Sequence, residues 1–153
     1  MRKSRKNTRP DGKVTRLDGS EWWYQDDKLH RTDGPALTRP DGTQEWWLNG
    51  KLHRIDGPAV TWIDGYQAWY LNGKRHREGG PAIMWPDGSE SWYQHGKLHR
   101  EDGPAVTGLY GLQVWYYEGK RHRTNGPAVL WPDGCQEWWL NGKKVDPRKA
   151  TDE

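Results

Sequence analysis

The sequence lacks phenylalanine, contains one cysteine and is only 32% hydrophobic over its 153 residues. A single cysteine excludes an internal disulfide and therefore a disulfide-stapled scaffold. The shortage of aliphatic residues argues against a deep core enclosed on all sides. No run of 18 apolar residues occurs, so the sequence predicts no membrane-spanning helix.

Aromatic residues are abundant instead, with 12 tryptophans and 7 tyrosines. Disordered chains are typically poor in aromatic residues, so this composition favours a folded protein. Large amphipathic rings spread along a polar chain indicate a thin structure that Trp and Tyr stabilise on one or two surfaces.

The net charge of +3 is unevenly distributed along the chain. Residues 1–12 contain five basic residues and one acidic residue, which gives this segment a charge of +4 and leaves −1 for the remainder. We expect residues 1–12 to form a flexible, solvated basic arm. Contact with nucleic acid or an acidic partner is the alternative for this arm alone, because the rest of the chain is nearly neutral.

A 23-residue repeat organises nearly the whole chain. A half repeat at 15–27 precedes five full repeats, which need no insertion or deletion and cover 28–50, 51–73, 74–96, 97–119 and 120–142. A further block opens at Lys143 but has Val145 in place of the repeated histidine. We therefore expect one β-repeat domain over 13–145, with a tail at 146–153. A stacked array needs atypical end repeats that cap its exposed edges.

Each repeat has the pattern of β-strands. The aromatic segment 67–71 is followed by Asn72-Gly73, a strong signal for a two-residue hairpin turn. Gly80-Pro81 predicts a bulge or bend, because proline cannot donate to a strand ladder, and Pro86-Asp87-Gly88 predicts another turn. Two strands per repeat give an all-β fold, an elongated single-layer antiparallel β-meander of about 11–12 strands with capped ends, roughly 50–60 Å long.

The run W-x-x-N-G-K-x-H, followed by a glycine and later by D-G, resembles the MORN repeat, whose unit has the same length. One repeat of this chain fills these places with Trp69, Asn72, Gly73, Lys74, His76, Gly80, Asp87 and Gly88. After the histidine, this chain has Arg-x-Asp-Gly-Pro-Ala where MORN repeats usually have Gly-x-Gly. That form is similar to MORN-variant repeat proteins of tailed phages, large DNA viruses and bacteria. The resemblance covers about Thr15 to Lys143 and implies a twisted, single-layer sheet with a groove.

MORN arrays serve mainly as scaffolds, protein-binding surfaces and proposed lipid binders, so the resemblance implies a non-enzymatic protein. It also implies a phage or other viral accessory protein that works in the cytoplasm of a host and binds or inhibits a host protein. Sheets with two open ends often associate, so a homo-oligomer is a further expectation.

Histidines recur once per repeat, at His30, His53, His76, His99 and His122. Zinc ligands converge at about 2 Å from the ion, whereas histidines one repeat apart would be roughly 10 Å apart. We interpret them as structural residues hydrogen-bonded to a neighbouring strand. Cys135 is interpreted as an incidental small residue, and no nucleophile elbow or phosphate loop occurs. The sequence thus predicts no catalytic residue, no metal ligand and no cofactor.

Aligned repeats place aromatic residues in three columns. The first contains Trp23, Trp46, Trp69, Trp92, Trp115 and Trp138. The second contains Tyr24, Trp47, Tyr70, Tyr93, Tyr116 and Trp139. The third is partial and contains Trp62, Trp85 and Trp131. Because consecutive strand residues face opposite sides, the first two columns lie on opposite faces. One column can be the core and the other merely half exposed. We predict instead that the second column is a binding face, since exposed aromatic patches usually mark interaction sites.

A basic stripe is predicted beside the aromatic columns, from Lys51, Arg54, Lys74, Arg77, Lys97, Arg100, Lys120 and Arg123. Cations beside aromatic rings can hold nucleotides or nucleic acid. The alternative is that aspartates of the neighbouring turns neutralise the stripe, namely Asp41, Asp64, Asp87 and Asp133. A second set of aspartates is expected to bond backbone amides or the arginines two residues earlier, at Asp33, Asp56 and Asp102.

The fourth repeat departs from the others at one turn, where Leu109, Tyr110 and Leu112 replace parts of W-P-D-G. Sequence drift and a partner-specific contact both account for this. The leading hypothesis is a non-enzymatic module that binds a host protein, or a copy of itself, through an aromatic face. The alternatives are capture of a small nucleotide or oligonucleotide on the Trp/Tyr ladder, and a structural role in a virion or at a membrane.

Overall fold

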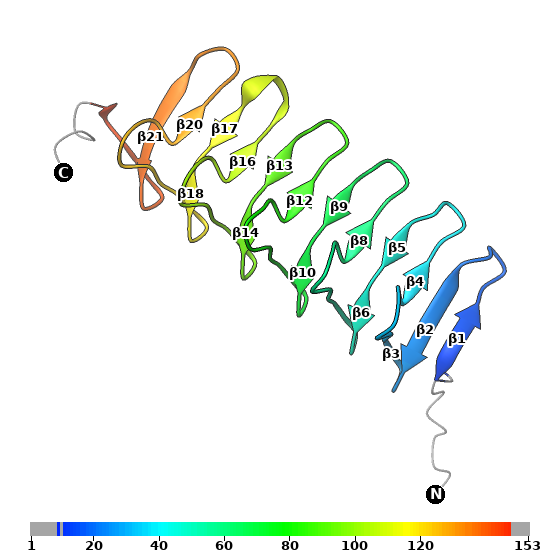
Figure 1. The fold of residues 1–153 in the computed structure, drawn as a ribbon. Coiled ribbons are helices and arrows are strands. Elements are labelled where there is room, and N and C mark those ends of the chain that lie inside the picture. The colour runs from blue at the N-terminus through cyan, green and yellow to red at the C-terminus, as the bar shows by residue number, and fades with distance from the viewer. Residues whose placement is uncertain (1–8, 10, 148–153) are drawn as a thin grey trace, which may run out of the picture.

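The computed structural model describes residue 9 and residues 11–147 (Figure 1). The expected fold class is confirmed, because the chain forms an elongated, single-layer antiparallel β-meander. Strands β1 (Gly12–Thr15) and β21 (Gln136–Leu140) lie at opposite ends of the array in Figure 1. In the described part of the chain, the helical structure consists of one 3₁₀ turn, η1 (Leu109–Gly111).

A long sheet of 14 strands runs through the array, and four two-stranded hairpins accompany it. In spatial order the long sheet contains β1, β2 (Glu21–Gln25), β4 (Leu37–Thr38), β5 (Gln44–Glu45), β8 (Val60–Thr61), β9 (Gln67–Ala68), β12 (Ile83–Met84), β13 (Glu90–Ser91), β16 (Val106–Thr107), β17 (Gln113–Val114), β20 (Val129–Leu130), β21 and β22 (Lys143–Val145), with β3 (Lys28–Leu29) paired to β2. The hairpins pair β6 (Trp47–Leu48) with β7 (Lys51–Leu52), β10 (Tyr70–Leu71) with β11 (Lys74–Arg75), β14 (Tyr93–Gln94) with β15 (Lys97–Leu98), and β18 (Tyr116–Tyr117) with β19 (Lys120–Arg121). Figure 1 shows the turns of the long sheet along one edge and the hairpins along the other.

Most first-column tryptophans mark the point where a strand changes its hydrogen-bonding partner. The Trp69 N–H donates to the Ala82 carbonyl at 2.8 Å, whereas the Trp69 carbonyl accepts from the His76 N–H at 3.1 Å. Before Trp69, β9 pairs within the long sheet, and after it β10 pairs in a local hairpin. The described residues form 22 short strands instead of the expected 11–12, because four aromatic strands are interrupted at their tryptophan and the returning strands are interrupted at the Gly-Pro segment.

The predicted Asn-Gly hairpin turns are present, with Asn72 at φ 51° and Gly73 at φ 79°. These left-handed angles are those of the hairpin turn that matches strand twist. Hairpins of adjacent repeats are also joined, since the Gly73 N–H donates to the Leu52 carbonyl at 2.8 Å. His95 and Glu118 replace the asparagine in two turns and still adopt φ values of 50° and 47°.

The core is thin, and most of its buried residues have small side chains. Alanines from the Pro-Ala segments are fully buried, at Ala36, Ala59, Ala82, Ala105 and Ala128. Val60, Ala68 and Ile83 form a buried cluster in the middle of the array, with Tyr66, Tyr70, Tyr93 and Leu52 packed against it. Because alanine side chains are small, the Pro-Ala backbone can lie against the strand of the first-column tryptophans, as in the hydrogen bond from the Trp69 N–H to the Ala82 carbonyl.

The two ends of the array are closed by longer hairpins than the middle. The first hairpin pairs β1 with β2 over four residue pairs, and the last pairs β21 with β22 over three. Lys13 forms an ion pair with Glu21, and Lys144 Nζ lies 2.8 Å from Glu137 Oε1. Charged lysines on outer strands oppose edge-to-edge association, so these hairpins fit the expected caps.

Part of the expected N-terminal arm belongs to this cap. Asp11 Oδ1 accepts from the Asp26 N–H at 2.9 Å, and the Arg9 guanidinium lies 5.0 Å from the Tyr24 ring. The rest of the expected arm, residues 1–8 and 10, and most of the expected tail, residues 148–153, lie outside the described residues.

Candidate binding surfaces

One face of the sheet carries a row of tryptophans covered by arginines, which we call the Trp–Arg face. The guanidinium carbons lie 4.3 Å (Arg31 over Trp23), 4.0 Å (Arg54 over Trp46) and 3.9 Å (Arg77 over Trp69, Arg100 over Trp92, Arg123 over Trp115) from the ring centroids. Such cation–π contacts contribute about 0.5–2 kcal/mol each. Each first-column ring is half-buried, so the column acts as a second, arginine-covered layer of packing.

Each arginine of this face is held by hydrogen bonds on its other side. Arg54 Nε donates to Asp56 Oδ1 at 2.9 Å, and Arg54 Nη1 donates to the Pro58 carbonyl at 3.3 Å. The first and fourth repeats have the same arrangement, with Nε to Oδ1 distances of 2.8 Å for Arg31–Asp33 and Arg100–Asp102. The expected pairing of these aspartates with arginines is therefore confirmed. The hydrogen bond and the charge of Arg54 lower the pKa of the Asp56 carboxyl.

Among the described residues, no turn aspartate of this set lies within ion-pair distance of an arginine or lysine of the stripe, and neutralisation of the stripe by these aspartates stays an alternative. Each accepts a hydrogen bond from the N–H two residues later, at 2.8–2.9 Å, in Asp41–Thr43, Asp64–Tyr66, Asp87–Ser89 and Asp133–Cys135. This is the Asx-turn bond that stabilises a tight turn. The hydrogen bonds that the Thr43 N–H and hydroxyl donate to Asp41 favour its charged form and so lower the pKa of its carboxyl.

The predicted basic stripe is separated into two rows. Its arginines lie on the Trp–Arg face, whereas its lysines lie along the hairpins. The stem of Lys51 packs against the Gly73 turn of the next hairpin, where an added Cβ on Gly73 would lie 3.6 Å from the Lys51 Cβ. The other lysines, Lys74, Lys97 and Lys120, pack in the same way against Gly96, Gly119 and Gly142.

The repeated histidines connect neighbouring hairpins, as expected. Nδ1 of each ring accepts the N–H of the turn residue of the next hairpin, 19 residues later, at 3.1–3.2 Å, from Asn49, Asn72, His95, Glu118 and Asn141. The acceptor role of Nδ1 requires the tautomer with its proton on Nε2. Within residue 9 and residues 11–147, no group of three or more His, Cys, Asp or Glu is placed to hold a metal ion.

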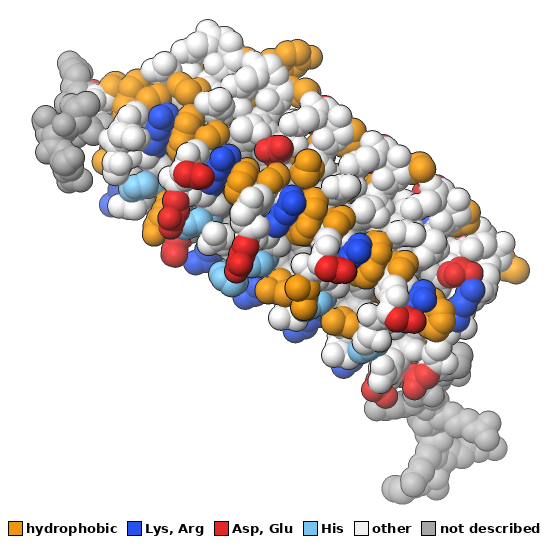
Figure 2. Space-filling model, in the orientation of Figure 1, with side chains coloured by type: hydrophobic (Ala, Val, Ile, Leu, Met, Phe, Trp, Pro, Cys, Tyr) orange, Lys and Arg blue, Asp and Glu red, His pale blue; other side chains and the backbone are white. Residues whose placement is uncertain are grey.

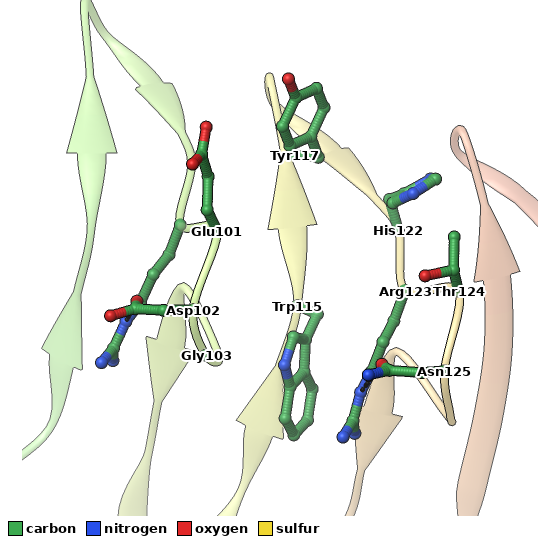
Figure 3. Close-up of a pocket in the computed structure, with 10 residues that line it drawn as sticks. Glu101, Asp102, Gly103, Trp115, Tyr117, His122, Arg123, Thr124 and Asn125 are labelled. Atoms are coloured by element: carbon green, nitrogen blue, oxygen red, sulfur yellow. Dashed lines mark hydrogen bonds and ion pairs between the residues drawn. The ribbon is translucent and has the colours of Figure 1, made fainter.

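The Trp–Arg face is hollowed between successive repeats. Figure 3 shows the hollow between repeats 97–119 and 120–142, where Trp115 lies between the loop of Asp102 and the loop of Arg123 and Asn125. This hollow has a volume of about 610 Å³, and equivalent hollows of about 550 and 620 Å³ precede it in the array. Figure 2 shows one face on which hydrophobic, basic, acidic and histidine side chains recur from one end of the array to the other.

The opposite face, which we call the tyrosine face, carries the second aromatic column. Tyr24 is only 6% exposed, so the structure removes it from the predicted exposed surface. The other members, Trp47, Tyr70, Tyr93, Tyr116 and Trp139, are half-buried. In the middle of the column, Arg75 links two rings by donating to both the Tyr70 and the Tyr93 hydroxyl, at 3.2 and 3.3 Å.

The most exposed tryptophans lie at the turn edge of the tyrosine face. Trp62, Trp85 and Trp131 are 47%, 37% and 41% exposed. Tyr66 joins this row to the core, since its ring lies 4.4 Å from Trp62 and 6.2 Å from Trp85 and also packs against the Val60–Ala68–Ile83 cluster. We call this row the aromatic edge. Sequence reasoning identified the third column without assigning it a role, although its position just before a turn was a signal of exposure.

The unusual turn of the fourth repeat belongs to the same edge. Tyr110 is 88% exposed and Leu109 is 49% exposed. Tyr110 adopts φ 59°, a left-handed conformation that is uncommon for a bulky residue. Leu112, the third predicted residue of this turn, is half-buried, and its N–H donates to the Leu109 carbonyl at 3.3 Å.

No protein-family model matches the chain, and no curated protein matches its sequence. Membership of the MORN-variant proteins therefore stays a prediction, carried by the repeat residues. No helix in the described part of the chain is long and apolar enough to cross a membrane.

Proposed function

We propose that the protein is a non-enzymatic repeat module that binds another protein through the tyrosine face and its aromatic edge. The support comes from a contiguous apolar surface in which buried cluster residues lead outward through Tyr66 to exposed Trp62 and Trp85. Exposed aromatic rings with an apolar body and a polar tip are the residues most enriched at protein-binding hot spots.

The observation that carries this proposal is the turn at Tyr110. Four other full-repeat turns, and the leading half repeat, close with an aspartate that accepts the N–H two residues later. The fourth repeat gives up that bond and places Tyr110 in a left-handed conformation with its side chain exposed. Strained backbone conformations cluster at functional sites, and the strain at Tyr110 is not offset by packing of its exposed side chain.

A comparison of two exposed tyrosines tests this proposal. The full chain and its Tyr110→Asp, Trp85→Ala and Tyr117→Ala variants would be used to capture proteins from the lysate of the cell in which it occurs. Tyr117 is 46% exposed and its tilted ring lies 4.8 Å from the ring of His99, away from the aromatic edge, so it is the matched control. We expect one stoichiometric protein to be retained by the parent and by Tyr117→Ala, and lost or weakened at least tenfold by the other two. Equal retention by the parent and all three variants would reject the aromatic edge as the binding surface.

Capture of a nucleotide has weaker support than protein binding. A base needs a free ring face on which to stack. In the described structure, five first-column rings already carry an arginine on one face. The proposed role in a virus or phage, and a site of action in the host cytoplasm, rest on the family resemblance alone.

A further inference from the structure

The five arginines of the Trp–Arg face differ in one respect, which is the residue two positions later. Arg31, Arg54 and Arg100 each have an aspartate there, within 2.8–2.9 Å of Nε. The fifth repeat has Asn125, whose Oδ1 lies 3.3 Å from Arg123 Nε. The third repeat has Gly79 and so provides no side chain at all. Among the described residues, no carboxylate lies within ion-pair distance of Arg77.

The Arg77 guanidinium nevertheless keeps the ring contact and the carbonyl hydrogen bond of its counterparts. It lies 3.9 Å from the Trp69 ring centroid, and its Nη1 donates to the Pro81 carbonyl at 3.1 Å. A Cβ added at Gly79 would meet no heavy atom within 4 Å. Arg77 Nε therefore lacks the carboxylate acceptor that Arg31, Arg54 and Arg100 find two residues later.

The hollow beside Arg77 has a second departure from the repeat pattern. It lies between repeats 51–73 and 74–96, has a volume of about 620 Å³ and is lined by Ile55, Trp69 and Leu71 as well as Arg77. Ile55 is 85% exposed. The other repeats have threonine or glutamate in its place, at Thr32, Glu78, Glu101 and Thr124. An apolar wall and a cation without an ion-pair partner thus meet in one hollow.

The remaining charged groups of this hollow are already engaged or point to solvent. Asp56 is paired with Arg54 at 2.9 Å. Glu78 is 91% exposed, and its nearest basic atom is His76 Nε2 at 3.9 Å. Arg54 offsets the charge of Asp56, and the exposure of Glu78 weakens its opposition to an incoming anion through solvent screening.

We propose that this hollow binds an acidic peptide segment of a partner protein. One Asp or Glu carboxylate of the segment pairs with Arg77, and a neighbouring aliphatic side chain packs on Ile55 and Leu71. The carboxylate takes the position that Asp56 occupies beside Arg54, so the chain itself shows that this geometry is favourable. Because the site lies on the face opposite the aromatic edge, it stands independently of the function proposed above.

The test follows the arginine Nε–H signals of the full-length, ¹⁵N-labelled protein by NMR. The probe is an N-acetylated, C-amidated pentapeptide with one leucine and one aspartate among glycines, and the matched probe has asparagine in place of aspartate. We expect the aspartate peptide to shift the Arg77 signal in a saturable manner while the Arg100 signal stays in place. A response to the asparagine peptide of equal size, or equal shifts at Arg77 and Arg100, would overturn the proposal.

Substitutions at Gly79 separate the carboxylate site from general effects on the loop. Gly79→Asp supplies an internal carboxylate and should weaken peptide binding at least fivefold. Gly79→Ala imposes a side chain on the same backbone, at φ 69°, without a charge, and should retain binding. Glu78→Gln should tighten binding, and Ile55→Thr should weaken it. Undiminished binding by Gly79→Asp would reject the site. Capture of a partner through the aromatic edge should be unchanged in Gly79→Asp, so the two proposals can fail separately.

Discussion

The two faces of this sheet stabilise the same strands in different ways. On the Trp–Arg face, five aromatic rings are covered by arginines, and three of those arginines are in turn paired with aspartates. On the tyrosine face, apolar side chains form a thin core that ends in exposed tryptophans. On the Trp–Arg face, three of the five arginines find their carboxylate within the chain, whereas the tyrosine face leaves tryptophan rings in contact with solvent. A single-layer sheet can thus be stable without a second layer and still offer a surface to a partner.

The largest expected effect on the free energy of unfolding comes from comparing one tryptophan of each face. Trp69→Ala removes a half-buried ring together with its Arg77 stack and should cost about 3 kcal/mol of unfolding free energy. Trp85→Ala removes a ring at the aromatic edge that is 37% exposed and should cost less than about 1.5 kcal/mol. Urea unfolding followed by circular dichroism measures both. Equal losses would show that the edge tryptophans belong to the core.

A smaller effect, of opposite sign, is expected at the fourth-repeat turn. Tyr110→Asp restores the residue that closes the other turns and removes a bulky side chain from φ 59°. We expect a gain of roughly 0.5–1 kcal/mol in the same unfolding measurement. Asp64→Tyr, the reverse change in the second repeat, is the control and should destabilise the protein. A loss of stability in Tyr110→Asp would mean that Tyr110 supports the fold.

The arginine-paired aspartates predict the response to acid. Hydrogen bonds and charge from Arg31, Arg54 and Arg100 lower the pKa values of Asp33, Asp56 and Asp102 in the folded protein. A lowered folded pKa gives stability that is present above the ordinary pKa, near 4, and is lost as pH falls through the folded value.

Urea midpoints measured from pH 7 down to pH 2 should therefore decrease below about pH 4. The triple substitution of these aspartates by asparagine should flatten that decrease, with Glu78→Gln as a control that retains it. An unchanged slope in the triple variant would assign the acid response to other carboxylates.

The smallest expected effect concerns Cys135 in the fifth-repeat turn. The Asp133 hydrogen bond and charge raise the pKa of the exposed Cys135 thiol. Less thiolate is therefore present at pH 8, and Asp133→Asn should increase the rate of alkylation by iodoacetamide. Mass spectrometry over time measures that rate, and Asp87→Asn in another turn is the control. Equal rates in the parent and Asp133→Asn would contradict the assigned cause.

Much of the fold could be predicted because its signals are local. The Asn-Gly and Asp-Gly turns, the Gly-Pro interruption and the constant 23-residue period each depend on residues close in sequence. The pairing of Asp56 with Arg54 could be anticipated for the same reason. Strand number could not, because the change of partner at Trp69 depends on Ala82, which lies in the following segment.

The candidate surfaces were only partly predictable. Alternation placed the first two aromatic columns on opposite faces, but it could not show that Tyr24 is buried or that Arg75 separates Tyr70 from Tyr93. The turn edge formed by Trp62 and Trp85 also depends on how Tyr66 packs between them. These contacts join residues of different strands, so no single repeat contains the information.

The sequence by itself determined the all-β repeat architecture, its period and its turns, because glycine, proline and asparagine restrict the backbone locally. Only the tertiary structure decided which side of each ring is covered and which remains open. The reason is that coverage depends on adjacent repeats, such as the loop of Asp56 facing Trp69 and Arg77 across one hollow. The missing carboxylate at Gly79 was visible in the sequence, but it became a candidate site only when the structure placed Ile55 beside Arg77.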